Sequence, residues 1–133
     1  MADNFKERFS QAVKETETVV YSYLPGETGH QRTIFEAMNY SVKAGGKRLR
    51  PLLMREVYRL FGGNGPEIEP FMAAMEMIHT SSLIHDDLPC MDNDEYRRGK
   101  LPTWKAYGYD MAVQAGDALM NYGVETAAKA LSM

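Results

Sequence analysis

An acidic stretch followed at once by a basic one is the part of the sequence most able to do chemistry. Residues 84–100 read IHDDLPCMDNDEYRRGK, with five carboxylates within ten residues and three cations directly after them. Carboxylates can bind a metal ion and arginines can bind phosphate oxygens, so the two runs together suggest a site for a phosphorylated ligand. A solvated charged loop is the plainer alternative for any such run.

The spacing of the aspartates favours a site. Asp86 and Asp87 follow an apolar helical pattern, and Asp92 comes six residues after Asp86, which is the wrong interval for one helical face. Pro89 disfavours helix at Leu88, so the chain must loop and can bring Asp92 back beside Asp86. An all-oxygen site of this kind suits Mg²⁺ that shares its coordination with a phosphate. The stretch lacks the ligand spacing, central glycine and closing glutamate of an EF-hand, which argues against calcium.

A second cationic segment lies earlier in the chain. Residues 45–51 read GGKRLRP, so Lys47, Arg48 and Arg50 stand where one helix ends and another begins. Cations at a helix N-terminus oppose the helix dipole, and three of them cost stability unless an anion binds there. A solvated basic turn is the alternative. In the acidic–basic stretch, Asp87, Arg97 and Arg98 are further candidate residues, and its carboxylates, arginines and expected Mg²⁺ together would form a clamp for a diphosphate.

One histidine shares a helix side with the acidic residues. His79 precedes Asp86 by seven residues, or two turns, so both lie on the same side of the expected helix. A histidine on an apolar face is usually a core residue, but this position favours a ligand-facing role. His85 faces elsewhere and is interpreted as structural.

The elements that must position these residues are all helical. Apolar residues recur at helical intervals in five segments, beginning near Phe5, Ile34, Leu52, Ile68 and Met111. The fourth segment is the longest, and its apolar residues up to Ser82 and Leu83 are expected on one broad face. No alternating strand pattern of useful length occurs, so the fold class is all-α.

Composition excludes several classes of protein. The 133 residues are 44% hydrophobic and 25% charged, which is enough for a folded core. The net charge of −3 gives no general field for nucleic acid, and a single cysteine excludes an internal disulfide. No signal peptide or apolar run of membrane-spanning length is present, so we expect a cytoplasmic protein without a membrane span.

Taken in order, these motifs resemble the trans-isoprenyl diphosphate synthases, the farnesyl and geranylgeranyl diphosphate synthases. The resemblance rests on GGKRLRP at 45–51, His79, DDLPCMD at 86–92, RRG at 97–99 and AGDAL at 115–119. It implies an all-α helical bundle with a deep central cavity. It also implies a prenyltransferase that joins an allylic diphosphate head-to-tail to isopentenyl diphosphate.

The resemblance assigns roles to individual residues. Asp86, Asp87 and Asp92 match the first aspartate-rich motif, whose outer members ligate Mg²⁺ that bridges the allylic diphosphate, with Asp87 as a further candidate ligand. Arg97 matches a contact to the same diphosphate. The residues that match the isopentenyl diphosphate pocket are Lys47, Arg50, His79 and Arg98.

Product length is expected to depend on the helix turn before Asp86. Ser81 and Ser82 are both small, whereas the family's farnesyl synthases of this type tend to carry a bulky aromatic residue at the position of Ser81. Their size predicts a deeper pocket and a product of twenty carbons or more. A residue on another helix, such as Met120, is the alternative floor.

The chain also departs from the family. No second aspartate-rich motif follows Glu125, and the family's members are more than twice as long. We therefore expect residues 1–133 to be the N-terminal half of one domain, with weak or no activity alone. A non-catalytic diphosphate-binding or partner-binding subunit is the alternative. Small residues on the last helix, Ala112, Ala115, Ala118 and Gly123, suggest a homodimer.

Overall fold

The computed structural model describes residues 2–133, with side chains from residue 4 onward, and confirms the all-α class. The part of the chain that it describes contains no strand, only an isolated bridge between Arg97 and Lys100. Its helices are α1 (Ala2–Ser22), α2 (Arg32–Lys43), α3 (Leu49–Leu60), η1 (Pro66–Ile68), α4 (Glu69–Asp86), α5 (Thr103–Tyr107), α6 (Tyr109–Ala128) and η2 (Lys129–Ser132).

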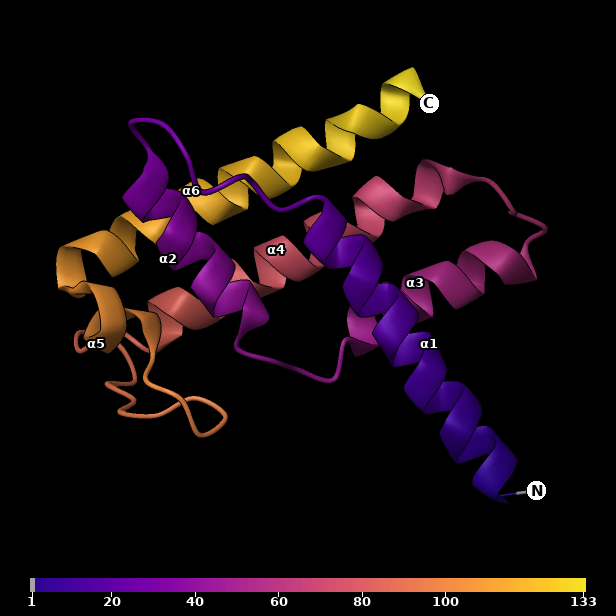
Figure 1. The fold of residues 1–133 in the computed structure, drawn as a ribbon, viewed down its shortest axis with the longest axis horizontal. Helices are drawn as coiled ribbons and strands as arrows, with labels where there is room; N and C mark the ends of the chain where they lie inside the picture. Colours follow the sequence, from indigo (N-terminus) through magenta and orange to yellow (C-terminus); the bar gives the residue numbers. More distant parts are fainter. Residues whose placement is uncertain (1) are drawn as a thin grey trace.

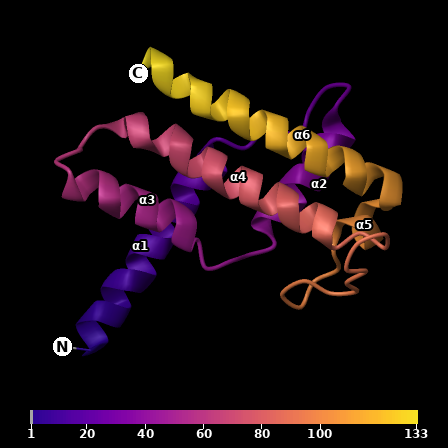
Figure 2. The same ribbon diagram turned by 180° about the vertical axis from the view of Figure 1, so that it is seen from behind.

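Helix α4 is the central element. It runs beside α6 along most of its length in the opposite direction, while α1, α2 and α3 pack around it (Figures 1 and 2). Pro70 lies in its first turn, where a missing N–H is tolerated, and the helix ends at Asp86, three residues before Pro89. The core contains the fully or almost fully buried residues Val20, Ala37, Met38, Val42, Ala73, Met77, Ile84, Leu88, Ala112, Ala115 and Leu119.

Small residues let α4 and α6 approach closely. A Cβ added to Gly116 would lie 2.2 Å from Nε2 of His85, and one added to Gly123 would lie 3.3 Å from the carbonyl oxygen of Ala74. Ala112 and Ala115 are completely buried. Three of the four small residues that suggested a dimer therefore lie against α4 or in the core within the chain, which corrects that interpretation of the last helix.

The apolar residues of α4 do not form one broad face. Met72 is fully buried, whereas Phe71, Met75 and Ile78 are 44%, 38% and 40% exposed. Because α4 has neighbours on several sides, its inward positions form the core and a separate stripe faces outward. Phe71, Met75, Ile78 and the exposed Ser82 follow one another at intervals of three or four residues, and Asp86 ends the series.

Within residues 2–133, no helix has both the length and the apolar character that crossing a bilayer requires.

Candidate diphosphate-binding site

The loop after α4 folds back on the helix end. The backbone N–H of Asp92 donates to the carbonyl oxygen of Asp86 at 2.8 Å, and those of Met91 and Asn93 donate to Leu88 at 2.9 and 3.0 Å. Asn93 adopts a left-handed conformation, with φ of 53°, that closes this turn. The prediction that Pro89 forces a loop returning Asp92 to Asp86 is therefore confirmed for the backbone.

The donor set at this loop fits Mg²⁺ as a shared ion. Asp86 is half-buried and Asp92 is exposed. No three His, Cys, Asp or Glu side chains in the described part of the chain are arranged to hold a metal ion by themselves. Mg²⁺ commonly takes one or two carboxylates and completes its shell with water and substrate phosphate, so two carboxylates without a third suit it.

Asp87 has a different environment from its neighbours. Its side chain is 3% exposed, and Arg97 donates to both of its oxygens, from Nε and from an Nη, each at 2.7 Å. This fork-to-carboxylate pair raises the pKa of the Arg97 guanidinium. Both oxygens of Asp87 are thus engaged, and the candidate metal ligands are Asp86 and Asp92.

Asp94, which the sequence analysis did not single out, lies near this pair. The pKa of the Asp94 carboxyl is raised. The main cause is desolvation, followed by the hydrogen bond to Asp87 and the negative charge of Asp87. Its backbone carbonyl accepts a hydrogen bond from the Trp104 indole at 3.0 Å. No motif marked Asp94, because its setting arises from a fold-back of the loop.

A tight turn directs the two adjacent arginines to different partners. The backbones of Arg97 and Lys100 exchange hydrogen bonds at 2.8 and 3.0 Å, while Arg98 and Gly99 have φ of 51° and 77°, as a two-residue hairpin turn requires. Arg97 turns to Asp87, and Arg98 donates to the carbonyl oxygen of Gly45 at 2.5 Å. The acidic–basic stretch and the glycine segment, 53 residues apart, therefore meet in space.

A basic pocket of about 340 Å³ lies where they meet. It is lined by Gly46, Lys47, Arg48, Leu49, Arg50, Glu76, His79 and Arg98. The structure thus brings together all four residues predicted for one diphosphate pocket. Gly46 has φ of 145°, and a Cβ there would lie 3.3 Å from the Arg98 guanidinium, so glycine allows the close approach of the two segments.

His79 lies beside Arg50 in the basic pocket. Its Nε2 lies 3.2 Å from an Nη of Arg50. Burial, followed by the positive charge of Arg50, lowers the pKa of the His79 imidazole, while Glu76 acts in the opposite sense. An uncharged His79 can accept a hydrogen bond from Arg50, and an anion in the pocket would favour its protonated form.

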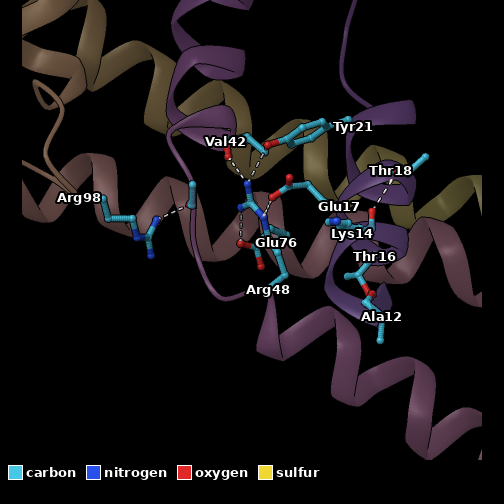
Figure 3. Close-up of polar contacts among 11 residues, drawn as sticks. Ala12, Lys14, Thr16, Glu17, Thr18, Tyr21, Val42, Arg48, Glu76 and Arg98 are labelled. Carbon is cyan, nitrogen blue, oxygen red and sulfur yellow. Dashed lines mark hydrogen bonds and ion pairs between the residues drawn. The ribbon is translucent and has the colours of Figure 1, made fainter. Parts of the chain in front are cut away.

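Arg48 behaves unlike the two cations beside it. Its side chain is 1% exposed and donates to Glu17 at 3.0 Å, to Glu76 at 2.9 Å, to the Tyr21 hydroxyl at 3.1 Å and to the Val42 carbonyl at 2.8 Å (Figure 3). The expectation that all three cations need a bound anion is therefore wrong for Arg48. Its carboxylate partners lie 31 and 28 residues away, so local spacing held no signal for them.

Ser81 and Ser82 differ in exposure. Ser81 is 4% exposed and Ser82 is exposed on the outward stripe that ends at Asp86. Their hydroxyls donate to the carbonyls of Ile78 and His79 at 2.7 and 2.6 Å. Of the two serines, only Ser82 lies on the exposed stripe of α4 that ends at Asp86.

Comparison with known proteins decides the family. The sequence model of the polyprenyl synthetase family matches residues 31–133. The chain belongs to the polyprenyl synthetase family. This agrees with the resemblance carried by the GGKRLRP, DDLPCMD and RRG motifs.

Relatives within the family carry two product names. The chain is 56% identical over 99 residues to heterodimeric geranylgeranyl pyrophosphate synthase large subunit 1, chloroplastic, of Arabidopsis thaliana, covering 74% of this chain and 27% of the relative. It is 52% identical over 104 residues to farnesyl diphosphate synthase of Micrococcus luteus, covering 78% of this chain and 34% of the relative. Both relatives are thus named as prenyl diphosphate synthases, with different products.

Solved structures share the fold. An FPP/GFPP synthase from Zymomonas mobilis has a TM-score of 0.85 and 41% identity, covering 96% of this chain and 46% of that one. A geranyltransferase from Legionella pneumophila has a TM-score of 0.86 and 33% identity, covering 96% and 44%. The chain thus spans about a third or less of these curated relatives and just under half of these solved structures.

Proposed function

We propose that the chain carries the diphosphate-recognition part of a prenyltransferase that joins an allylic diphosphate head-to-tail to isopentenyl diphosphate. The observation that carries the proposal is the convergence of Lys47, Arg50, His79 and Arg98 on one pocket, beside a loop that returns Asp92 to Asp86. A reaction between two diphosphate esters needs two such anion sites close together.

The basic pocket is proposed to bind isopentenyl diphosphate. Lys47, Arg50 and Arg98 supply cationic donors for the diphosphate, and His79 can add a proton-dependent one. Fixing the diphosphate orients the attached alkene, which is the nucleophile of the reaction.

The acidic loop is proposed to bind the allylic diphosphate. Asp86 and Asp92 would hold Mg²⁺, which supplies positive charge to a diphosphate as it leaves. Arg97 and the buried Asp87 form the neighbouring wall, where the guanidinium charge also favours the developing anion. The departing diphosphate then serves as the base that removes the final proton.

The outward stripe of α4 is proposed as the wall for the hydrocarbon. Phe71, Met75 and Ile78 are apolar, and the series leads away from Asp86 past Ser82. When the diphosphate held near Asp86 leaves, the allylic carbocation would thus face hydrocarbon rather than water, which limits its capture by water. The small Ser82 on this stripe supports a twenty-carbon product in preference to a fifteen-carbon one.

We expect residues 1–133 alone to show weak or no synthase activity, and we expect a homodimer. A cytoplasmic setting also stays a prediction, because one relative named above is chloroplastic.

Titration calorimetry with inorganic pyrophosphate tests the two sites separately. Without Mg²⁺, Lys47→Gln and Arg50→Gln are each expected to weaken binding about tenfold, as loss of a charged phosphate contact does. With Mg²⁺ a second, tighter event is expected, and Asp86→Asn together with Asp92→Asn should remove that event alone.

Lys105→Gln is the matched control, since this lysine pairs with Glu95 and lies outside the pocket. The proposal would be overturned if neither Lys47→Gln nor Arg50→Gln weakened pyrophosphate binding. It would also be overturned if the Mg²⁺-dependent binding event remained after both aspartates were replaced. Product formed from labelled isopentenyl diphosphate by the 133-residue chain would contradict the expected low activity.

A further inference from the structure

The buried Arg48 network joins α1 to the basic pocket. Arg48 bridges Glu17 and Tyr21 on α1 to Glu76 on α4, and it also donates to the carbonyl oxygen of Val42 near the end of α2 (Figure 3). Both Arg48 and Glu76 line the pocket, and Lys47 precedes Arg48 directly. The network is therefore part of the pocket wall as well as of the core.

The backbone at Arg48 supports a positioning role. Its φ of 54° and ψ of 28° are left-handed, a conformation that costs a non-glycine residue about 1 kcal/mol or more. Four hydrogen bonds of the side chain hold this conformation, and helix α3 starts at the next residue. The direction in which Lys47 and Arg50 leave the backbone thus depends on Arg48.

We propose that Arg48 is a positioning residue, and that Glu17 and Tyr21 of α1 act through it to set the affinity of the basic pocket for a diphosphate. The inference rests on the proposed function of that pocket and adds a control element to it. Helix α1 lies ahead of residues 31–133, the part of the chain that the family model matches.

Charge-conserving and charge-removing variants separate positioning from plain electrostatics. Arg48→Lys keeps the charge but loses the planar fork, so electrostatics alone predicts unchanged pyrophosphate binding. Glu17→Ala removes a carboxylate near the pocket, so electrostatics alone predicts tighter binding. Positioning predicts that both variants bind pyrophosphate weaker by about fivefold to tenfold in titration calorimetry without Mg²⁺.

Matched controls come from a neighbouring ion pair between α1 and α3. Arg55 is 8% exposed on α3 and its guanidinium lies 3.8 Å from Glu15 on α1, away from the basic pocket. Arg55→Lys and Glu15→Ala are expected to leave pyrophosphate affinity within about twofold of the unchanged chain. A purely structural role of Arg48 would lower stability but leave the affinity of the folded chain unchanged.

Hydrogen exchange of the amides of residues 45–48 tests the same inference without a ligand. Faster exchange in Arg48→Lys and Glu17→Ala, but not in the controls, is the expected result. Unchanged affinity in Arg48→Lys, or tighter binding in Glu17→Ala, overturns the inference. Should Arg48→Lys fail to fold, Glu17→Ala decides alone, because Glu17 is partly exposed. If the unchanged chain does not bind pyrophosphate, the proposed function fails. Hydrogen exchange then decides the inference, which is overturned if the amides of residues 45–48 exchange at unaltered rates in both variants.

Discussion

His79 shows how neighbours control the charge of one side chain in the basic pocket. Burial and Arg50 hold the pKa of His79 below the value of about 6.5 that it has in an unfolded chain. As pH falls through this value the unfolded chain takes up the proton first, so the free energy of unfolding should decrease below about pH 6.5 and be unaffected above it. His79→Gln should flatten this part of the profile in urea unfolding.

His30→Gln provides the comparison, since His30 is exposed and does not line the basic pocket. An unchanged pH profile in His79→Gln would contradict the lowered pKa of His79.

The pair formed by Asp87 and Arg97 carries a second prediction. Asp87→Asn leaves Arg97 without its carboxylate, and a broken buried pair costs about 3–5 kcal/mol. Because the Arg97 side chain is 28% exposed, we expect a smaller loss of about 2–3 kcal/mol in chemical unfolding. Glu95→Gln removes the exposed partner of Lys105 and should cost less than about 0.5 kcal/mol. Equal losses in the two variants would show that burial does not distinguish these pairs.

Sequence reasoning located residues better than it assigned their environments. The position of Pro89 predicted the loop that returns Asp92 to Asp86, because it acts through a local backbone rule. The grouping of the four pocket residues followed from the family resemblance, since Arg98 and Gly45 lie 53 residues apart. Arg48 could not be separated from Lys47 and Arg50 in the same way. Its burial depends on Glu17 and Glu76, whose proximity exists only once α1 and α4 are packed.

At the scale of elements, the same limit applies to α4 and α6. Periodicity identified both helices, but it could not show which apolar residues of α4 face outward. It also suggested a partner surface for Ala112 and Ala115, which the structure buries inside the chain. The short α5 escaped prediction because five residues are too few for a periodic pattern.

The contact between α4 and α6 is testable at Gly116. Gly→Ala inside a helix normally stabilises by about 0.5–1 kcal/mol, but here the new Cβ would meet the His85 ring. Gly116→Ala should instead lower stability by up to about 1 kcal/mol, because the partly exposed His85 ring must turn away from the Val113 carbonyl. Adding His85→Ala should recover much of that loss in a double-mutant cycle, whereas additive effects would refute the clash.

The two candidate floor residues differ in what they tolerate. Ser81→Tyr places a large ring at a buried position and should lower the melting temperature, at a cost of about 1–3 kcal/mol. Ser82→Tyr adds the same ring on the exposed stripe and should change stability by less than about 0.5 kcal/mol. In any assembly that forms product, Ser81→Tyr is predicted to shorten it, and unchanged product length in both variants would refute this role.

At the scale of the whole molecule, the expected homodimer must use a surface other than the small residues of α6. The outward side of that helix offers Met120 and Val124, which are 46% and 61% exposed. If the dimer forms there, sedimentation should show twice the chain mass, and Met120→Glu with Val124→Glu should restore the single-chain mass. Phe61→Glu, at an exposed apolar residue that follows α3, is the control. A monomer at all concentrations would contradict the homodimer.

The hairpin turn of residues 97–100 has a thermodynamic consequence for two ligands bound at once. Arg97 is tied to the end of α4 and Arg98 to the carbonyl of Gly45, so one short turn borders both candidate sites. A ligand that orders this turn at one site lowers the conformational entropy lost when the second ligand binds. Linkage then requires each ligand to raise the affinity of the other by the same factor, whichever arrives first.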